Sequence, residues 1–181
     1  MPDFRSYQNS NRLCSLAKLK GAKVITTVSS EEKANFCKAL GADHTIIYSS
    51  ADIIDEVQRL TNNKGADLII DTVGAEVFKQ SISCAAYFGR LITLLDPGEQ
   101  SLAEARIKNL LIGFELMLTP QLKQLNNARD KQVEILKKCT TWIEQGMLNA
   151  HISNNLTLDQ VALGHNQIEQ GHTTGKIIIT M

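Results

Sequence analysis

The chain has 181 residues, of which 43% are hydrophobic and 21% are charged, which is enough for one hydrophobic core of ordinary size. Its 19 basic residues balance 19 acidic ones, so no charge excess would draw it to nucleic acid or to an anionic membrane. No apolar run is long enough to cross a bilayer, and the polar start excludes a secretory signal; we therefore expect a cytoplasmic protein.

The first third of the chain alternates helices and strands. Residues 1–12 are polar, differ from everything after them, and are expected to form a separate leader. The elements predicted next are a helix, a strand, a helix, a strand and a helix, over residues 13–20, 23–28, 29–40, 44–48 and 52–60. Gly21 ends the first helix and Gly41 the second. Ser29 followed by Glu32 is a capping box that would begin the second helix.

The remaining two thirds repeat this alternation. The continuously apolar run 66–71 predicts a strand that is buried on both faces. After it we expect a helix, a strand, an apolar stretch, two helices and a closing strand, over residues 76–86, 90–95, 109–118, 128–145, 157–169 and 176–180. The apolar face of the long helix consists largely of Val133, Ile135, Leu136, Trp142 and Ile143. A second capping box, Thr157 with Gln160, begins the last helix. Strands alternating with helices at this spacing favour an α/β fold, a doubly wound parallel sheet with helices on both faces.

Side chains that could bind metal or act as nucleophiles are dispersed. The four cysteines have no CxxC pairing and are expected to be buried or half-buried free thiols: Cys14, Cys37, Cys84 and Cys139. The four histidines are equally scattered, so no metal site is expected. No GxSxG motif occurs, and no tyrosine is followed four residues later by lysine. We therefore predict no catalytic residue.

Several segments in the right order carry a family resemblance. They are LAKLKGAKVITTVSSEEKANFCKALGADHTIIY from residue 16, IIDTVG at 69–74, FGRLITLL at 88–95 and GHTTGKIIIT at 171–180. From Leu13 onward the chain resembles the cofactor-binding half of the medium-chain dehydrogenase/reductase family, in the zinc-type alcohol dehydrogenase-like and quinone oxidoreductase branch. The resemblance implies a Rossmann-like fold, NADP as cofactor, and hydride transfer to a small carbonyl or quinone substrate.

Two parts of the family pattern are not matched. The opening strand and its GxGxxG-type loop would precede LAKLKG, where this chain has SYQNSNRLC, and the catalytic domain would come before that loop. We therefore expect a partial NADP-binding Rossmann domain over residues 13–181 that is not active alone. In the family, the terminal strand within 171–181 belongs to the catalytic domain. The alternatives are a non-catalytic remnant and a nucleotide-binding or interaction module.

The resemblance assigns a first group of cofactor-binding residues to the end of the strand 23–28. The residues that would surround the 2′-phosphate of NADP are Ser29, Ser30, Lys33 and Tyr48. A helix N-terminus and a lysine both favour an anion, whereas Glu31 and Glu32 would repel it if they faced it. The alternative is that Ser29 and Glu32 only cap the helix and that Lys33 is a solvated surface charge.

A second group follows the strands 66–71 and 90–95. By the resemblance, Asp71, Val73 and Gly74 lie beside the adenosine ribose, and Leu94 with Leu95 lies near the nicotinamide. Ligands of open α/β folds bind at this carboxyl edge of the sheet. The alternative is that Asp71 caps the following helix and Gly74 eases the turn.

A Rossmann-like sheet without its first strand has a gap. That strand would lie between strands 23–28 and 66–71, so its absence leaves roughly 10 Å between them. We expect one of three outcomes: the two strands pair directly, another chain completes the sheet, or the protein is marginally stable. The closing strand 176–180 would be a further apolar edge, so self-association or a partner chain is expected.

Overall fold

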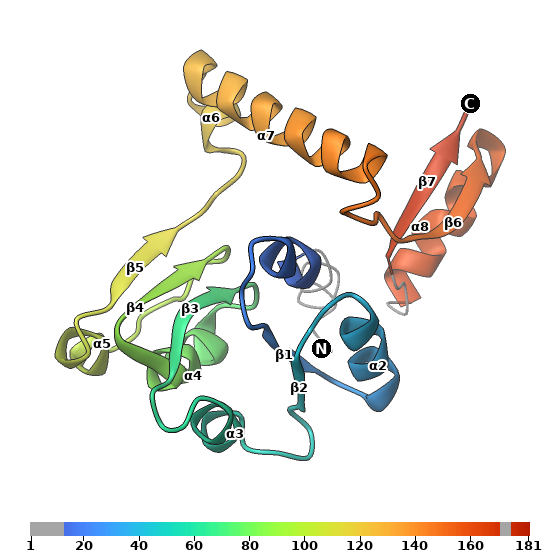
Figure 1. Ribbon diagram of the computed structural model, residues 1–181. Coiled ribbons are helices and arrows are strands. Elements are labelled where there is room, and N and C mark those ends of the chain that lie inside the picture. The colour runs from blue at the N-terminus through green and yellow to red at the C-terminus, as the bar shows by residue number, and fades with distance from the viewer. Residues whose placement is uncertain (1–12, 171–174) are drawn as a thin grey trace.

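The computed structural model describes residues 13–170 and 175–181, so the predicted leader 1–12 lies outside the described residues (Figure 1). The strands are β1 (Ile25–Val28), β2 (His44–Ile47), β3 (Ala66–Asp71), β4 (Ala85–Thr93), β5 (Leu111–Phe114), β6 (Ile152–Thr157) and β7 (Lys176–Thr180). The helices are α2 (Glu31–Ala39), α3 (Ile53–Leu60), α4 (Ala75–Cys84), α5 (Ala103–Ile107), α6 (Thr119–Leu122), α7 (Asn126–Glu144), the 3₁₀ helix η1 (Leu158–Gln160) and α8 (Val161–Gln170). Residues 13–19 are also helical.

The strands form three parallel sheets within the described residues. Their orders are β1-β2, β3-β4-β5 and β6-β7. The register aligns Ile25 with His44 in the first sheet and Ile69 with Leu91 in the second. The predicted α/β fold with parallel strands is confirmed. The expectation that β1 and β3 might pair directly is wrong, because the two strands lie in separate sheets.

Helices cover both faces of the first sheet, and the alternation of side chains along β1 explains how. Val28 faces a buried cluster formed with the helix 13–19 and with α2. Ile25, three residues earlier in the pleat, contacts a cluster built on α3 instead. The doubly wound arrangement therefore begins at β1.

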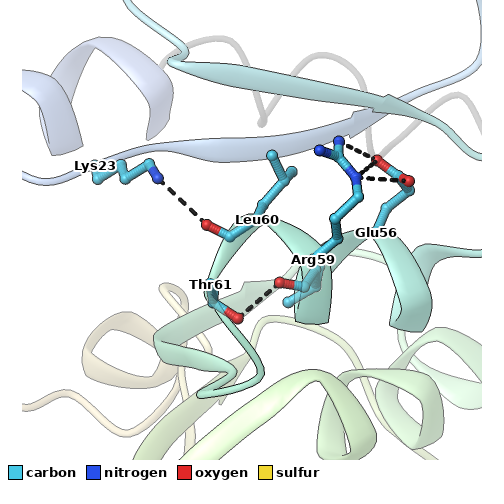
Figure 2. Close-up of polar contacts among 6 residues, drawn as sticks. Lys23, Glu56, Arg59, Leu60 and Thr61 are labelled. Atoms are coloured by element: carbon cyan, nitrogen blue, oxygen red, sulfur yellow. Dashed lines mark hydrogen bonds and ion pairs between the residues drawn. The ribbon is translucent and has the colours of Figure 1, made fainter.

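Helix α3 joins the first sheet to the second. Its Val57 packs against Ile46 of β2, and Ile69 of β3 lies against the same cluster. Figure 2 shows that Lys23, just before β1, reaches the last turn of α3, where its Nζ donates to the carbonyl of Leu60 at 3.3 Å. Both sheets therefore pack against the same helix.

The second sheet is covered on one face by α4 and α5. Phe78, Ile82 and Leu91 form the centre of this buried layer. On the opposite face Leu68 is 55% exposed and Ile70 is 40% exposed, so the prediction of a strand buried on both faces is wrong. The reason is that no helix of the described residues covers this face as the helix 13–19 and α2 cover the first sheet. The apolar face of α7 is likewise exposed, except for the half-buried Trp142.

The closing strand β7 forms the third sheet by pairing in parallel with β6. One of its two edges is therefore paired, and the other stays open among the described residues. The sequence did not predict β6, since its central residues Ser153, Asn154 and Asn155 are polar. Thr157 and Gln160 form the predicted capping box, but it opens η1, and α8 follows.

Among the described residues, no helix is both long and apolar enough to cross a membrane.

Candidate functional site

The first predicted group meets where β1 ends and α2 begins. Ser30 is the N-cap of α2, with an extended backbone, and its Oγ accepts the backbone N–H of Lys33 at 3.4 Å. The predicted capping box from Ser29 is therefore wrong by one residue. Serine at either position offers the same hydroxyl, so the backbone conformation at residue 30 decides which one caps the helix.

Ser29 does not cap the helix; its hydroxyl instead binds the side chain of Lys33. The Nζ of Lys33 donates to Ser29 Oγ at 2.9 Å. The backbone N–H of Tyr48 donates to the carbonyl of Val28 at 3.1 Å, which extends the β1-β2 ladder by one residue and leaves the tyrosine half exposed. The structure thus gathers Ser29, Ser30, Lys33 and Tyr48 around the end of β1.

The local charge favours an anion at this point. The N-terminus of the nine-residue helix α2 carries a partial positive charge, and the ammonium of Lys33 adds a full one. Glu31 and Glu32 occupy the first turn of α2 and are both exposed. Their two carboxylates oppose this positive field, and water and salt screen charges in such exposed positions.

The second predicted group meets at the ends of β3 and β4, around a buried carboxylate. Asp71 Oδ1 accepts the backbone N–H groups of Val73 at 2.9 Å and Gly74 at 3.0 Å. Asp71 Oδ2 accepts the hydroxyl of Thr93 at 2.9 Å. The backbone carbonyl of Asp71 accepts the N–H of Leu94 at 2.9 Å. The carboxylate thus fixes the turn that follows β3.

Gly74 is the N-cap of α4 and provides no side chain for capping. The alternative that Asp71 itself caps the helix is therefore wrong, because the carboxylate binds the turn before it. Gly74 has φ of 78°, and a Cβ there would lie 2.9 Å from the carbonyl oxygen of Asp96. The close approach of the two loops requires glycine.

Thr93 is the residue of this group that sequence reasoning missed. It is buried, and its position opposite Asp71 in the parallel register brings the hydroxyl to the carboxylate. A polar residue inside the apolar run LITLL was the available signal, because a buried hydroxyl needs a partner.

The described residues offer no zinc site. No three of their His, Cys, Asp and Glu side chains gather where they could hold a metal ion. Four free thiols are present; Cys14, Cys37 and Cys84 are buried and Cys139 is half-buried. Burial raises the pKa of Cys84 to about 11, which keeps that thiol protonated at neutral pH.

Comparisons with known proteins point to one family. The profile described as "Zinc-binding dehydrogenase" matches residues 40–179. A quinone oxidoreductase-like protein 2 homolog of Nematostella vectensis is 35% identical over 173 residues, covering 90% of this chain and 45% of that protein. The chain spans about half the length of the curated relatives it matches.

Solved structures agree on the fold. An NAD-dependent alcohol dehydrogenase is 32% identical with a TM-score of 0.74, covering 93% of this chain and 46% of that one. The Escherichia coli quinone oxidoreductase complexed with NADPH is 20% identical with a TM-score of 0.77, covering 94% of this chain and 53% of that one. At that identity, the second likeness concerns the fold alone.

Proposed function

This chain belongs to the zinc-binding dehydrogenase family and corresponds to its C-terminal, cofactor-binding half. We propose that the residues gathered at the end of β1, Ser29, Ser30, Lys33 and Tyr48, bind the 2′-phosphate of NADP. The observation that carries the proposal is the contact of Lys33 Nζ with Ser29 Oγ beside the N-terminus of α2. It puts a cation and two hydroxyls at one point.

The chemistry of this group favours NADP over NAD. A carboxylate at the end of the second strand of a Rossmann unit would accept hydrogen bonds from the ribose hydroxyls of NAD, and it would repel a phosphate. Here that position has Ser29, followed by Ser30. Hydroxyls donate to phosphate oxygens, and the lysine neutralises part of the phosphate charge.

Replacing Lys33 by alanine is expected to weaken NADPH binding about 10- to 100-fold, because a hydrogen bond to a charged group contributes roughly 1.5–3 kcal/mol. NADH binding is expected to stay unchanged, since NADH lacks the 2′-phosphate. The measurement is a titration of the purified chain with each nucleotide, followed by nicotinamide fluorescence or calorimetry.

Lys38→Ala is the matched control for this variant. Lys38 lies in the last turn of the same helix and is exposed, so its loss changes the net charge equally without touching the group. Equal losses in the two variants would contradict the assignment of Lys33. No saturable binding of NADPH at millimolar concentration would overturn nucleotide binding altogether.

We further propose that the whole dehydrogenase unit transfers hydride to a carbonyl or quinone. Bound nicotinamide supplies the hydride, and the residues of this chain hold and orient the nucleotide. In this proposal Asp71, Val73 and Gly74 lie beside the adenosine ribose and Leu94 near the nicotinamide. A nucleotide-binding module without turnover is the second candidate. A measurement of NADPH oxidation with a quinone acceptor distinguishes the hydride-transferring enzyme from the binding module.

We propose a cytoplasmic location.

The partner that we propose is a polypeptide strand that enters between β1 and β3. Among the described residues, β1 pairs only with β2 and β3 only with β4. Each therefore has an edge that can accept another strand, and such edges promote association. Sedimentation velocity of the purified chain is expected to show association that grows with concentration. A monodisperse monomer with one cooperative thermal transition would contradict this.

A further inference from the structure

The turn after β3 and the loop after β4 are in direct contact. The backbone carbonyl of Asp71 accepts the N–H of Leu94 at 2.9 Å. Gly74 approaches the loop so closely that an added Cβ would lie 2.9 Å from the carbonyl oxygen of Asp96. The position of one segment therefore limits the position of the other.

A single buried hydroxyl joins the two segments. Thr93 Oγ1 lies 2.9 Å from Asp71 Oδ2, in the turn 71–74, and 2.9 Å from the carbonyl oxygen of Leu95, in the loop 94–96. It also accepts the N–H of Leu95 at 3.4 Å. Thr93 is only 1% exposed, so it acts through the residues that it holds and not by contact with a ligand.

The hydroxyl has one proton and two acceptors at the same distance. When it donates to the Asp71 carboxylate it holds the turn, and when it donates to the Leu95 carbonyl it holds the loop. Loss of the hydroxyl would release the loop more than the turn, because Asp71 still accepts the N–H groups of Val73 and Gly74.

We propose that Thr93 is a positioning residue, whose hydroxyl sets the loop 94–96 against the turn 71–74 so that both halves of one NADPH molecule fit. The proposal rests on the proposed function, in which this turn lies beside the adenosine ribose and Leu94 lies near the nicotinamide. Binding of the whole nucleotide then depends on the Thr93 hydroxyl, whereas binding of its adenosine half does not.

The test titrates the purified full chain with NADPH and with 2′,5′-ADP, which has the adenosine ribose and the 2′-phosphate but no nicotinamide. Thr93→Val replaces the hydroxyl by a methyl group of similar size. It is expected to weaken NADPH binding about 3- to 10-fold, the effect of one ordinary hydrogen bond, and to change 2′,5′-ADP binding by less than about twofold. The readout is the ratio of the two Kd values, because a variant that was merely less stable would lose affinity for both ligands in equal proportion.

Two further variants serve as controls. Thr93→Ser keeps the hydroxyl and is expected to keep the wild-type ratio. Thr61→Val removes a hydroxyl that also makes two hydrogen bonds, donating to the carbonyl of Val57 at 2.7 Å and accepting the N–H of Gly65 at 3.0 Å. Thr61 lies before the opposite end of β3, so its ratio is expected to stay unchanged. If Thr93→Val does not fold, Thr93→Ala compared with Thr93→Ser isolates the same hydroxyl.

The outcomes separate this role of Thr93 from nucleotide binding itself. An unchanged ratio in Thr93→Val, while the wild-type chain binds both ligands, would overturn the positioning role and leave the proposed function standing. No saturable binding of either ligand to the wild-type chain at millimolar concentration would overturn the proposed function, and the positioning role with it.

Discussion

Replacing Gly65 by alanine is expected to reduce the free energy of unfolding by about 2–5 kcal/mol. Gly65 has φ of 80°, a left-handed conformation that costs a residue with a side chain about 1–2 kcal/mol. The added Cβ would also lie 2.7 Å from the carbonyl carbon of Ala85 and from the nitrogen of Ala86. These are backbone atoms at the start of β4, so relief requires a shift of the strand, and overpacking of this kind costs about 1–3 kcal/mol.

Gly21→Ala separates the two contributions. Gly21 has φ of 77°, close to that of Gly65, but a Cβ there would meet nothing within 4 Å. Its replacement is expected to cost only the left-handed conformation, about 1–2 kcal/mol. Urea unfolding followed by circular dichroism measures both variants. Equal losses of unfolding free energy in the two variants would mean that the close contact of residue 65 with the backbone of β4 does not contribute to stability.

The alternation of apolar runs predicted the elements because each run follows the period of its own structure. The segment 66–71 forms β3, and Thr157 with Gln160 forms the capping box expected from their spacing. The predictions that failed concern properties set by neighbouring helices and strands. Leu68 was expected to be buried because its run is apolar, yet burial needs a covering helix, and no local pattern states where that helix lies. β6 was missed because its pairing with β7 outweighs its polar composition.

In the candidate site, too, contacts between residues close in sequence could be predicted, and contacts between separate elements could not. Ser29, Ser30 and Lys33 are consecutive or one turn apart, so their meeting at the end of β1 follows from the strand-to-helix transition itself. The shared burial of Cys14 and Cys37 in one cluster could not be predicted, because two helices separated by β1 must first pack together. The polarity of Thr93 in the run LITLL signalled a buried partner, but not which one, since that partner, Asp71, comes from another strand.

Replacing Asp71 by alanine is expected to lower the free energy of unfolding by about 2–6 kcal/mol, because each buried hydrogen-bonding group left without its partner costs about 1–3 kcal/mol. The variant removes the acceptor for Val73, Gly74 and Thr93 in a position that is 2% exposed. The N–H groups of Val73 and Gly74 then lose their acceptor, whereas the hydroxyl of Thr93 can still donate to the carbonyl of Leu95 at 2.9 Å. Thermal and urea unfolding of the purified variant measure the loss.

Asp71→Asn tests whether geometry or charge carries this contribution. The amide oxygen of asparagine still accepts the N–H groups of Val73 and Gly74, and its NH₂ can donate to Thr93 Oγ1. The threonine hydroxyl can then donate to the carbonyl of Leu95, which lies 2.9 Å away. The loss is therefore expected to be only about 1 kcal/mol, the net value of one ordinary hydrogen bond. A loss as large as that of alanine would show that the negative charge itself, and not the set of acceptors, holds the turn after β3.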